Sequence, residues 1–295
     1  MPSGTVPSGT VPSGTVPELP EVETVRRDLA DALLGAEVDA VSVTGLRSTR
    51  RHADSQEFIG ALLGARLVAF RRLGKYLLID LGLGGDPEPG AVLVAHLRMS
   101  GQLRLAAGPD EALARHSHVV MSFADGRQLR FVDPRTFGEL FVTTTDVPEL
   151  SSLGIDALDP GLTVARLAQL LEARRGGMKA VLLDQRIVAG IGNIYSDEIL
   201  WAARIRWSRR ANSLRPVEVR RLHEAMVTTL GAAVDQRGSS LRDQQYVDLA
   251  GRSGTFQERH AVYAHEGQPC PRCGRAIERL TAAGRSHFWC RRCQR

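Results

Sequence analysis

The sequence has no long hydrophobic run. Its longest apolar stretch, residues 91–95, is far short of the roughly eighteen residues that a membrane-spanning helix needs, and its N-terminus does not resemble a signal peptide. We therefore expect a cytoplasmic protein. With 295 residues, of which 43% are hydrophobic, the chain has enough material for two ordinary domains or one large domain.

Lysine is almost absent, because Lys75 and Lys179 are the only lysines among 38 basic residues. The planar guanidinium of arginine suits phosphate oxygens and base edges, although a biased genome would produce the same ratio. The two remaining lysines indicate positions that need a flexible point charge, with chance as the alternative. Residues 201–295 hold eighteen arginines and eight acidic residues, a net charge of +10 that leaves −5 for the rest of the chain.

Cysteine is absent until the last 26 residues, which hold two Cys-x-x-Cys pairs separated by sixteen residues: Cys270, Cys273, Cys290 and Cys293. This spacing is typical of a structural site in which four thiolates bind one Zn²⁺ and a β-hairpin joins the pairs. Disulfides are the weaker alternative for a cytoplasmic chain. Arginines surround the pairs, with Phe288 and Trp289 between them, which indicates contact with nucleic acid: Arg272, Arg275, Arg279, Arg285, Arg291 and Arg292.

The first sixteen residues lack charge and, after Met1, consist of the unit Pro-Ser-Gly-Thr-Val repeated three times. A low-complexity repeat of this kind cannot build a core. We predict that residues 1–16 are a leader that is absent from the mature protein.

The N-terminal half has one amphipathic helix followed by many short strands. Val22, Val25, Leu29 and Leu33 share one face of the helix, which Gly35 ends. The expected strands are 38–43, 65–73, 76–81, 91–97, 118–123, 128–131 and 139–142. Short strands after one helix predict a β-sandwich or a barrel.

The C-terminal half is helical after a boundary near residues 146–152. Residues 162–174 and 214–238 have helical spacing, the second with an apolar stripe that ends at Gly238: Val219, Leu222, Met226, Val227, Leu230 and Val234. Between these helices, Gly190–Asn193 forms a turn that opens a third helix carrying Ile199, Leu200 and Ala203. Such a turn is able to seat a phosphate, although most are structural.

Six segments, in this order, resemble the formamidopyrimidine-DNA glycosylase family: "PELPEVETVRR", "LGKYLL", "HLRMSGQL", "DPRTFGEL", "LLDQRIVAGIGNIYSDEILW" and the cysteine pairs. The resemblance covers residues 17–294. It implies an α+β multi-domain fold, with a two-layer β-sandwich catalytic domain (17–146), a helix–two-turns–helix domain (152–238), a loop region that caps the lesion (239–261) and a zinc finger (262–295). It also implies that the partner is damaged double-stranded DNA, bent in the cleft between the domains.

The resemblance implies that the amine of Pro17 attacks C1′ of the damaged nucleotide, with Glu18 as its acidic partner. Lys75 resembles a general acid or a phosphate-contacting lysine at the cleft, and Arg285 belongs to the same catalytic set. Without the resemblance, Glu18 and Glu21 would be read as charges that stabilise a helix N-terminus, and Lys75 as a solvated strand end. Glu21 remains open to that structural interpretation.

The resemblance assigns DNA contacts to further residues. Met99, Arg135 and Phe137 resemble the side chains that fill the hole left by the extruded nucleotide; the family often has arginine at the position of Thr136. Phosphate contacts are implied for His96, Lys179, Asn193 and Arg285, and Glu198 matches an acid that orients the N-terminal amine. Residues 239–259 match the capping loop, and their glycine-rich, polar composition predicts a mobile lid.

Three functions follow as alternatives. The first is a glycosylase and lyase for oxidised purines, with one structural Zn²⁺, no small-molecule cofactor and a monomeric state. The second is an endonuclease VIII-like enzyme for oxidised pyrimidines, against which Leu19 and Pro20 argue because glycine is usual after Pro-Glu in that class. The third is a damaged-DNA binding protein, which results if Pro17 is an internal amide; we predict that translation starts instead at Val16, installed as methionine and then removed.

Overall fold

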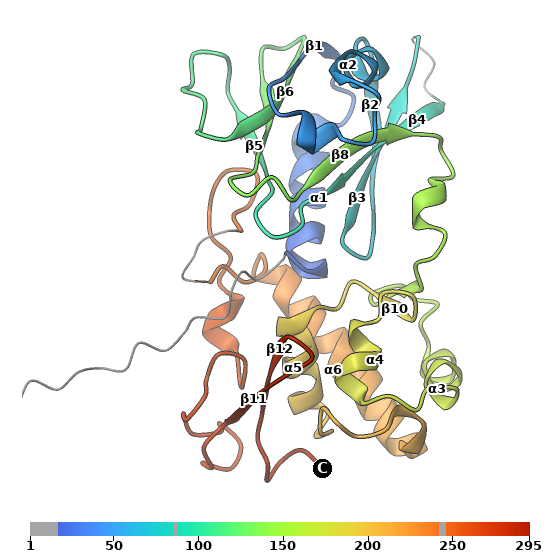
Figure 1. The fold of residues 1–295 in the computed structure, drawn as a ribbon, viewed down its shortest axis with the longest axis vertical. Coiled ribbons are helices and arrows are strands. Elements are labelled where there is room, and N and C mark those ends of the chain that lie inside the picture. Colours follow the sequence, from blue (N-terminus) through green and yellow to red (C-terminus); the bar gives the residue numbers. More distant parts are fainter. Residues whose placement is uncertain (1–16, 85–87, 242–245) are drawn as a thin grey trace, which may run out of the picture.

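The structure, a computed structural model, describes residues 17–84, 88–241 and 246–295. The predicted leader, residues 1–16, and part of the predicted capping loop, residues 242–245, lie outside the described residues. Figure 1 shows a β-rich part at the upper end of the molecule and a helical part, with the C-terminal hairpin, at the lower end. No helix within the described ranges is long and apolar enough to cross a membrane.

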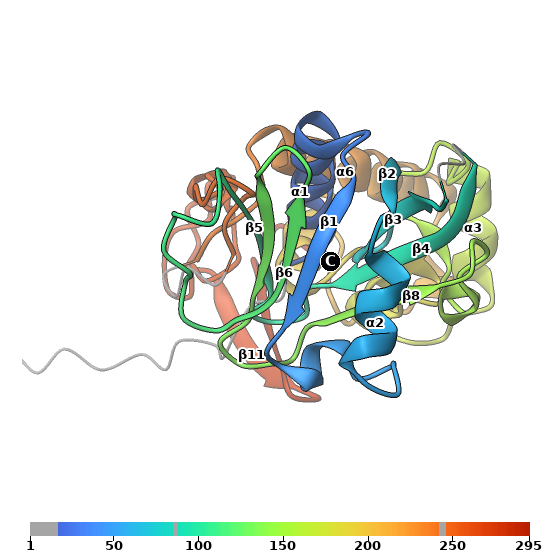
Figure 2. The ribbon, with the colours of Figure 1, turned by 90° about the horizontal axis from the view of Figure 1, so that it is seen from above.

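Two four-stranded antiparallel sheets form the β-rich part, and Figure 2 shows them side by side. The first sheet has the order β1-β6-β7-β5, with β1 Val38–Val43, β5 Gln102–Ala106, β6 Ser117–Phe123 and β7 Gln128–Val132. The second has the order β2-β3-β4-β8, with β2 Arg66–Leu73, β3 Tyr76–Gly82, β4 Pro89–His96 and β8 Glu139–Thr143. Apolar side chains from both sheets belong to one buried cluster, so the predicted two-layer β-sandwich is confirmed.

Helix α1 (Leu19–Leu33) belongs to both parts of the molecule. The four apolar residues predicted for its buried face, from Val22 to Leu33, join the core of the sandwich. Leu19, at its first turn, joins the core of the helical part. The short helix α2 (Ser55–Leu62), capped by Asp54, adds Phe58 and Leu62 to the sandwich core.

Four helices form the second part: α3 (Val164–Glu172), α4 (Met178–Leu183), α5 (Asn193–Ala202) and α6 (Pro216–Asp235). Short elements flank or connect them: β9 (Ile155–Asp156), β10 (Val188–Ala189) and the 3-10 helices η2 (Pro148–Leu150), η3 (Ala211–Ser213) and η4 (Phe256–Arg259). The 3-10 helix η1 (Leu46–Thr49) lies in the β-rich part, between β1 and α2. The predicted stripe on α6 is buried except at Val227, which is 45% exposed. Val227 follows buried Met226 and is rotated about 100° away from it, toward solvent.

The chain ends in the antiparallel hairpin of β11 (Glu278–Ala282) and β12 (Arg285–Trp289). The hairpin lies between the two cysteine pairs, as the spacing predicted. Phe288 and Cys290 belong to the same core as helices α5 and α6, so the hairpin is packed onto the helical part.

Candidate active site and DNA-binding surface

Three segments that carry predicted site residues meet at one end of the second sheet. The strand register pairs Leu73 with Tyr76 and Tyr76 with His96, so the turn that holds Lys75 lies beside the end of β4. His96 in turn pairs with Glu139, the first residue of β8. Figure 1 shows the turn between β2 and β3 pointing toward the helical part.

The carboxylate of Glu18 occupies the N-terminus of α5. It accepts hydrogen bonds from the backbone N–H groups of Gly192 (2.7 Å), Ile194 (2.8 Å) and Tyr195 (3.3 Å). A Cβ at Gly192 would lie 2.3 Å from the Glu18 carboxyl carbon, so only glycine leaves room for this contact. The turn that the sequence suggested as a phosphate seat therefore binds an anion, and that anion is the side chain next to Pro17.

Glu21 is a second buried carboxylate beside Pro17. It accepts hydrogen bonds from the Glu18 N–H (2.9 Å), the Tyr195 hydroxyl (2.6 Å) and the Ser239 N–H (2.7 Å). These donors come from the residue that precedes α1, from α5 and from the segment after α6. Burial and the neighbouring Glu18 carboxylate raise the pKa of Glu21 to about 7. These contacts favour the interpretation of Glu21 as a structural residue that joins both parts of the molecule.

Charges concentrate around Pro17, which is itself buried. Burial raises the pKa of Glu18 above its usual value, although the charge of Lys75 and the N–H groups of α5 oppose the shift. Burial lowers the pKa of half-buried Lys75, opposed by Glu18 and Glu21 and reinforced by Arg285. Both shifts bring the pKa values of Glu18 and Lys75 closer to neutral pH, where a carboxyl and an ammonium group are able to accept and donate protons during a reaction.

Asp133 holds together the two loops that carry Met99, Arg135 and Phe137. This fully buried carboxylate accepts hydrogen bonds from the Ser100 hydroxyl, the Arg135 N–H (3.2 Å) and the Gly138 N–H (2.7 Å). Arg135 is exposed and stacks 4.8 Å from the centroid of the Phe137 ring, which is 37% exposed. Met99 is half-buried. The structure thus brings the predicted trio together on adjacent loops.

Three arginines that the sequence did not single out surround Glu139 beside these loops. Arg50, Arg51 and Arg98 pair with its buried carboxylate at 2.9 Å, 3.1 Å and 3.2 Å. Three guanidinium groups on one carboxylate leave a local charge of +2. The adjacent pair Arg50-Arg51 was the signal available in the sequence.

The predicted phosphate contacts His96 and Asn193 have different surroundings. Burial and the charges of Arg98 and Lys75 lower the pKa of His96 to about 3, so its ring is neutral. Its Nδ1 accepts a hydrogen bond from the Arg98 N–H (3.0 Å). The Asn193 Oδ1 atom is buried and has no hydrogen-bond partner within the described chain.

Lys179 lies inside the protein, with no exposed side chain. Its ammonium donates to the Asp197 carboxylate (2.8 Å) and to the Ser286 carbonyl (2.7 Å), and the same carboxylate accepts from the Phe288 N–H (3.0 Å). Burial raises the pKa of Asp197 to about 7. A direct phosphate contact of Lys179 would require it to leave these partners, which connect α4 with α5 and the hairpin.

Glu198 is also engaged internally. Its carboxylate accepts hydrogen bonds from the N–H groups of Ala261 (2.8 Å), Val262 (3.0 Å) and Tyr263 (2.7 Å), and its side chain is buried. In this structure Glu198 therefore fixes the chain that enters the zinc finger, where the resemblance had implied contact with the N-terminal amine.

The described part of the predicted capping region is anchored at both ends. Tyr246 and Leu249 are buried in the sandwich core, and the Leu105 N–H donates to the Leu249 carbonyl (3.0 Å). Arg237 pairs with buried Asp248 (2.7 Å) and with Asp28 of α1. Residues 246–252 therefore form a strap onto the β-sandwich.

The four cysteines form one cluster in which all ligand atoms lie within 4.8 Å of one another, and none forms a disulfide. The Sγ atoms of Cys270 and Cys293 are 4.0 Å apart, and those of Cys273 and Cys290 are 3.5 Å apart. A tetrahedron with Zn–S bonds of about 2.3 Å has edges of about 3.8 Å, so the cluster fits a structural Zn²⁺. The Trp201 indole N–H donates to the Cys270 Sγ (3.4 Å) and supports the site from outside.

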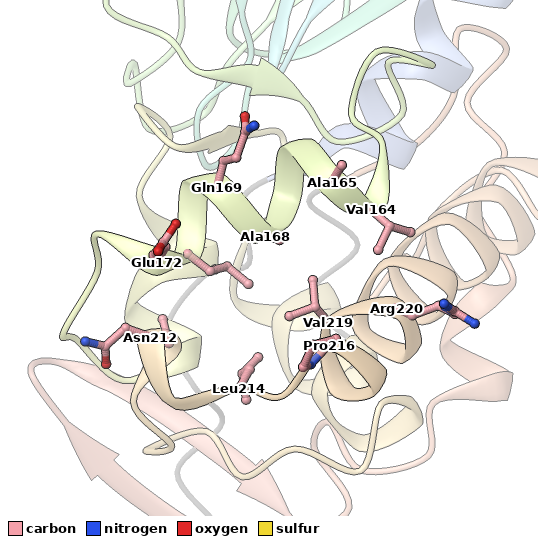
Figure 3. A pocket seen from close by; sticks show the side chains of 12 residues that line it. Val164, Ala165, Ala168, Gln169, Glu172, Asn212, Leu214, Pro216, Val219 and Arg220 are labelled. Atoms are coloured by element: carbon pink, nitrogen blue, oxygen red, sulfur yellow. The ribbon is translucent and has the colours of Figure 1, made fainter.

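A cavity of about 660 Å³ lies elsewhere, between α3 and the start of α6 (Figure 3). Aliphatic side chains such as Val164, Leu214 and Val219 line it, with Glu172 and Arg220 at its edge. None of the predicted site residues lines this cavity.

Three family models match the chain. The "Formamidopyrimidine-DNA glycosylase N-terminal domain" matches residues 16–140, and the "Formamidopyrimidine-DNA glycosylase H2TH domain" matches residues 153–245. The "Zinc finger found in FPG and IleRS" matches residues 267–295.

Curated relatives and solved structures agree with these matches. The chain is 40% identical to a formamidopyrimidine-DNA glycosylase of Pelotomaculum thermopropionicum, over 94% of this chain and 99% of the relative, and 45% identical to one of Moorella thermoacetica, over 89% and 94%. The MutM (Fpg) protein of Thermus thermophilus has a TM-score of 0.82 at 40% identity, covering 94% of this chain and 98% of that one. The Lactococcus lactis Fpg in complex with DNA containing an abasic site has a TM-score of 0.85 at 33% identity, covering 94% and 99%.

Proposed function

Because the chain belongs to the formamidopyrimidine-DNA glycosylase family, we propose that the residues gathered around Pro17 excise oxidised purines, such as 8-oxoguanine and formamidopyrimidines, from duplex DNA. The chain is a base-excision repair glycosylase with the AP lyase activity of this family. The observation that carries the assignment of the site is the position of Glu18, whose carboxylate is fixed by three N–H groups of α5 and thereby fixes the residue next to it.

In the first step the amine nitrogen of Pro17 attacks C1′ of the damaged nucleotide, the bond from C1′ to the base breaks, and the base leaves with a proton. Lys75 is the proposed donor, since its lowered pKa makes its ammonium a stronger acid than an exposed lysine. An unmodified α-amino group has a pKa of about 8, so part of it is neutral and nucleophilic at cellular pH, whereas an amide nitrogen is not.

In the second step the Pro17 nitrogen loses its proton to the Glu18 carboxylate, the bond between C1′ and the ring oxygen breaks, and Glu18 passes the proton to that oxygen. Burial raises the pKa of Glu18, which makes its carboxylate a better proton acceptor than an exposed glutamate. Because Pro17 is a secondary amine, the product is a cationic iminium that needs no further proton. The iminium acidifies the C2′ proton, whose removal expels the 3′-phosphate, and a second elimination expels the 5′-phosphate.

Positioning of DNA is assigned to the remaining residues. Met99, Arg135 and Phe137 fill the space of the extruded nucleotide, with the Arg135 guanidinium available to the edge of the opposite cytosine. Arg285, exposed at the hairpin, and Asn193 contact phosphates, and buried His96 shapes the cleft between them. Lys179 acts on Arg285 indirectly, through its hydrogen bond to the carbonyl of Ser286.

The proposed domain limits remain residues 17–146, 152–238, 239–261 and 262–295. Since its substrate is DNA, we place the enzyme at the nucleoid in the cytoplasm.

The test is borohydride trapping with a duplex that contains 8-oxoguanine opposite cytosine. A chain prepared with Pro17 as its first residue is expected to give a covalent adduct, and the same chain beginning at Met1, verified by intact mass, is expected to give none. Glu18→Gln in the shorter chain is the matched control: it keeps the amine and is expected to slow trapping. Equal trapping by the longer chain would show that Pro17 is not the nucleophile. A duplex with an oxidised pyrimidine in place of 8-oxoguanine tests the endonuclease VIII-like alternative.

A further inference from the structure

A cavity of about 450 Å³ opens at the end of the molecule that is farthest from the β-sandwich. It lies where the end of α5, the start of α6 and the cysteine pairs meet, near the C-terminus at the bottom of Figure 1. Apart from Cys293, its lining is charged: Arg204, Arg215, Glu218, Arg221, Arg272, Arg292 and Arg295. Six arginines and one glutamate give the side chains that line it a net charge of +5.

The fold accounts for three of these arginines. Arg215 pairs with buried Glu218 at 3.2 Å. The guanidinium of Arg272 donates to the Trp201 carbonyl (3.0 Å), and that of Arg221 donates to the Ala203 carbonyl. These carbonyls belong to the last turn of α5, where the helix itself offers no donors, so the two arginines cap the helix.

The other three arginines are not explained by the fold. Arg204, Arg292 and Arg295 are exposed, and in the part of the chain that the structure describes their guanidinium groups have no ion pair with a carboxylate. Like charges that face one cavity repel each other, which raises the free energy of the folded protein unless an anion binds between them.

We propose that this cavity is a binding site for a compact oligophosphate, separate from the catalytic cleft. Guanidinium groups bind phosphate oxygens through paired N–H donors, and several arginines converging on one cavity suit a ligand with several negative charges in a small volume. A volume of about 450 Å³ is within the range of small-molecule sites. The phosphates come either from a free oligophosphate or from the backbone of a second DNA segment, and the same three arginines would bind both.

The cavity lies next to residues that contact the predicted zinc site. The Arg272 guanidinium lies 4.1 Å from the centroid of the Trp201 ring, and the Trp201 indole N–H donates to Cys270. Arg292 directly precedes the ligand Cys293. A ligand that binds the folded protein here is therefore expected to raise its unfolding temperature.

The experiment uses the zinc-loaded protein with its catalytic cleft filled by a duplex that contains an abasic-site analogue. Tripolyphosphate is titrated at physiological ionic strength, and binding is followed by calorimetry and by the unfolding temperature. We expect one site per chain, and at least about tenfold weaker binding to Arg204→Gln/Arg295→Gln. The matched control, Arg115→Gln/Arg166→Gln, removes two exposed arginines that do not line the cavity and should bind within about twofold of the unaltered protein. Glycosylase activity of both variants should be unchanged.

Competition separates the two sources of phosphate. If an undamaged duplex displaces tripolyphosphate, and the Arg204/Arg295 variant loses this effect, the natural ligand is a DNA backbone; if only tripolyphosphate binds, it is a free oligophosphate. Either result supports the site. The proposal is overturned if tripolyphosphate does not bind, if both double variants weaken binding equally, or if a glutamate-rich peptide binds the cavity more tightly, which would indicate an acidic protein partner.

Discussion

The contacts of Glu21 illustrate how single residues join the active site to the rest of the fold. Its carboxylate is fully buried, and one of its three donors, Ser239, is 218 residues away from it in sequence. The network continues from the Tyr195 hydroxyl to Ser239 Oγ and from there to His260 Nε2, both at 3.1 Å. A buried carboxylate is stable in the folded protein when its oxygens accept hydrogen bonds. Removing one of the donors lowers the free energy of unfolding, because water does not take the place of the lost donor.

Tyr195→Phe removes one of these donors. We expect the free energy of unfolding to fall by about 2 kcal/mol at pH 8, where Glu21 is ionised, and by less at pH 6, where a carboxyl with a pKa of about 7 is mostly protonated. Urea unfolding at the two pH values measures the difference. Tyr76→Phe, which alters a half-buried tyrosine outside this network, is the control. An equal loss at both pH values would contradict the assignment to Glu21.

His260 gives a second prediction that depends on pH. Burial lowers its pKa to about 3, so below pH 6.5 the unfolded chain binds a proton that the folded chain does not. This residue therefore contributes stability that is complete above pH 6.5 and is lost as the pH falls toward 3. Between pH 7.5 and 5.5 the unaltered protein should lose about 1.4 kcal/mol more than His260→Gln. The free energies of unfolding of both proteins are measured at each pH, and their difference cancels the contributions of the other titrating groups. If the two stability curves are parallel between pH 7.5 and 5.5, His260 is not the cause of the loss.

At the scale of elements, the sequence predicted most of the sandwich, because its strands are short runs rich in Val, Leu and Ile that end at turn residues such as glycine and proline. Seven strands and α1 lie where they were expected, within one or two residues. Strand β5 and helix α2 were missed. Each is short, and α2 contains Gly60, so their structure depends on partners distant in sequence: β5 pairs with β7, and α2 buries Phe58 and Leu62.

The candidate site was less predictable, for the same reason. The motifs located Pro17, Glu18 and the cysteines, but no local pattern shows that Glu18 meets an N-terminus more than 170 residues away. Nor does a sequence reveal burial of a charged residue. Lys179 and Glu198 match family positions, and their pairing with protein atoms depends on tertiary packing.

The role of Lys179 in joining α4, α5 and the hairpin leads to a prediction about these elements. Lys179→Met leaves Asp197 buried without its charged partner, which should lower the free energy of unfolding by about 3–5 kcal/mol. Adding Asp197→Asn removes the unpaired charge and keeps an acceptor for the Phe288 N–H, so the double variant should regain part of the loss. Denaturant unfolding of the two variants compares them directly. A double variant less stable than Lys179→Met would exclude the buried charge as the cause.

The strap of residues 246–252 holds the sandwich through Leu249. Leu249→Ala removes a side chain that is 4% exposed, and we expect a loss of about 2–4 kcal/mol in the free energy of unfolding. Leu280→Ala, at a position that is 44% exposed, is the control and should cost less than about 0.5 kcal/mol. If the two variants are equally stable, the strap is not anchored by its apolar contact.

Two features of the whole molecule, the packing of α1 and the distribution of charge, support the binding of DNA at the junction of the two parts. Helix α1 contributes to the core on each side of the junction, which fixes the active-site end of the sheet against α5. Charge is distributed unequally, with +10 in residues 201–295 and −5 in the rest. The helical part and the zinc finger are therefore expected to supply most of the attraction for phosphates, and in the proposed function the sandwich supplies the side chains that act on the sugar and fill the stack.

This division of labour predicts different effects of salt for residues on the two sides of the cleft. The affinity for DNA falls linearly with the logarithm of the salt concentration, with a slope of about −0.9 for each phosphate contact. Arg285→Gln should therefore weaken binding to a duplex with an abasic-site analogue and make the slope shallower by about one. Met99→Ala removes an uncharged side chain and should weaken the same complex without changing the slope. Fluorescence anisotropy at several salt concentrations measures both quantities. If the slope is unchanged in Arg285→Gln, the hairpin does not contact phosphate, and the positive charge of the C-terminal region has to act elsewhere, as the arginine-lined cavity would allow.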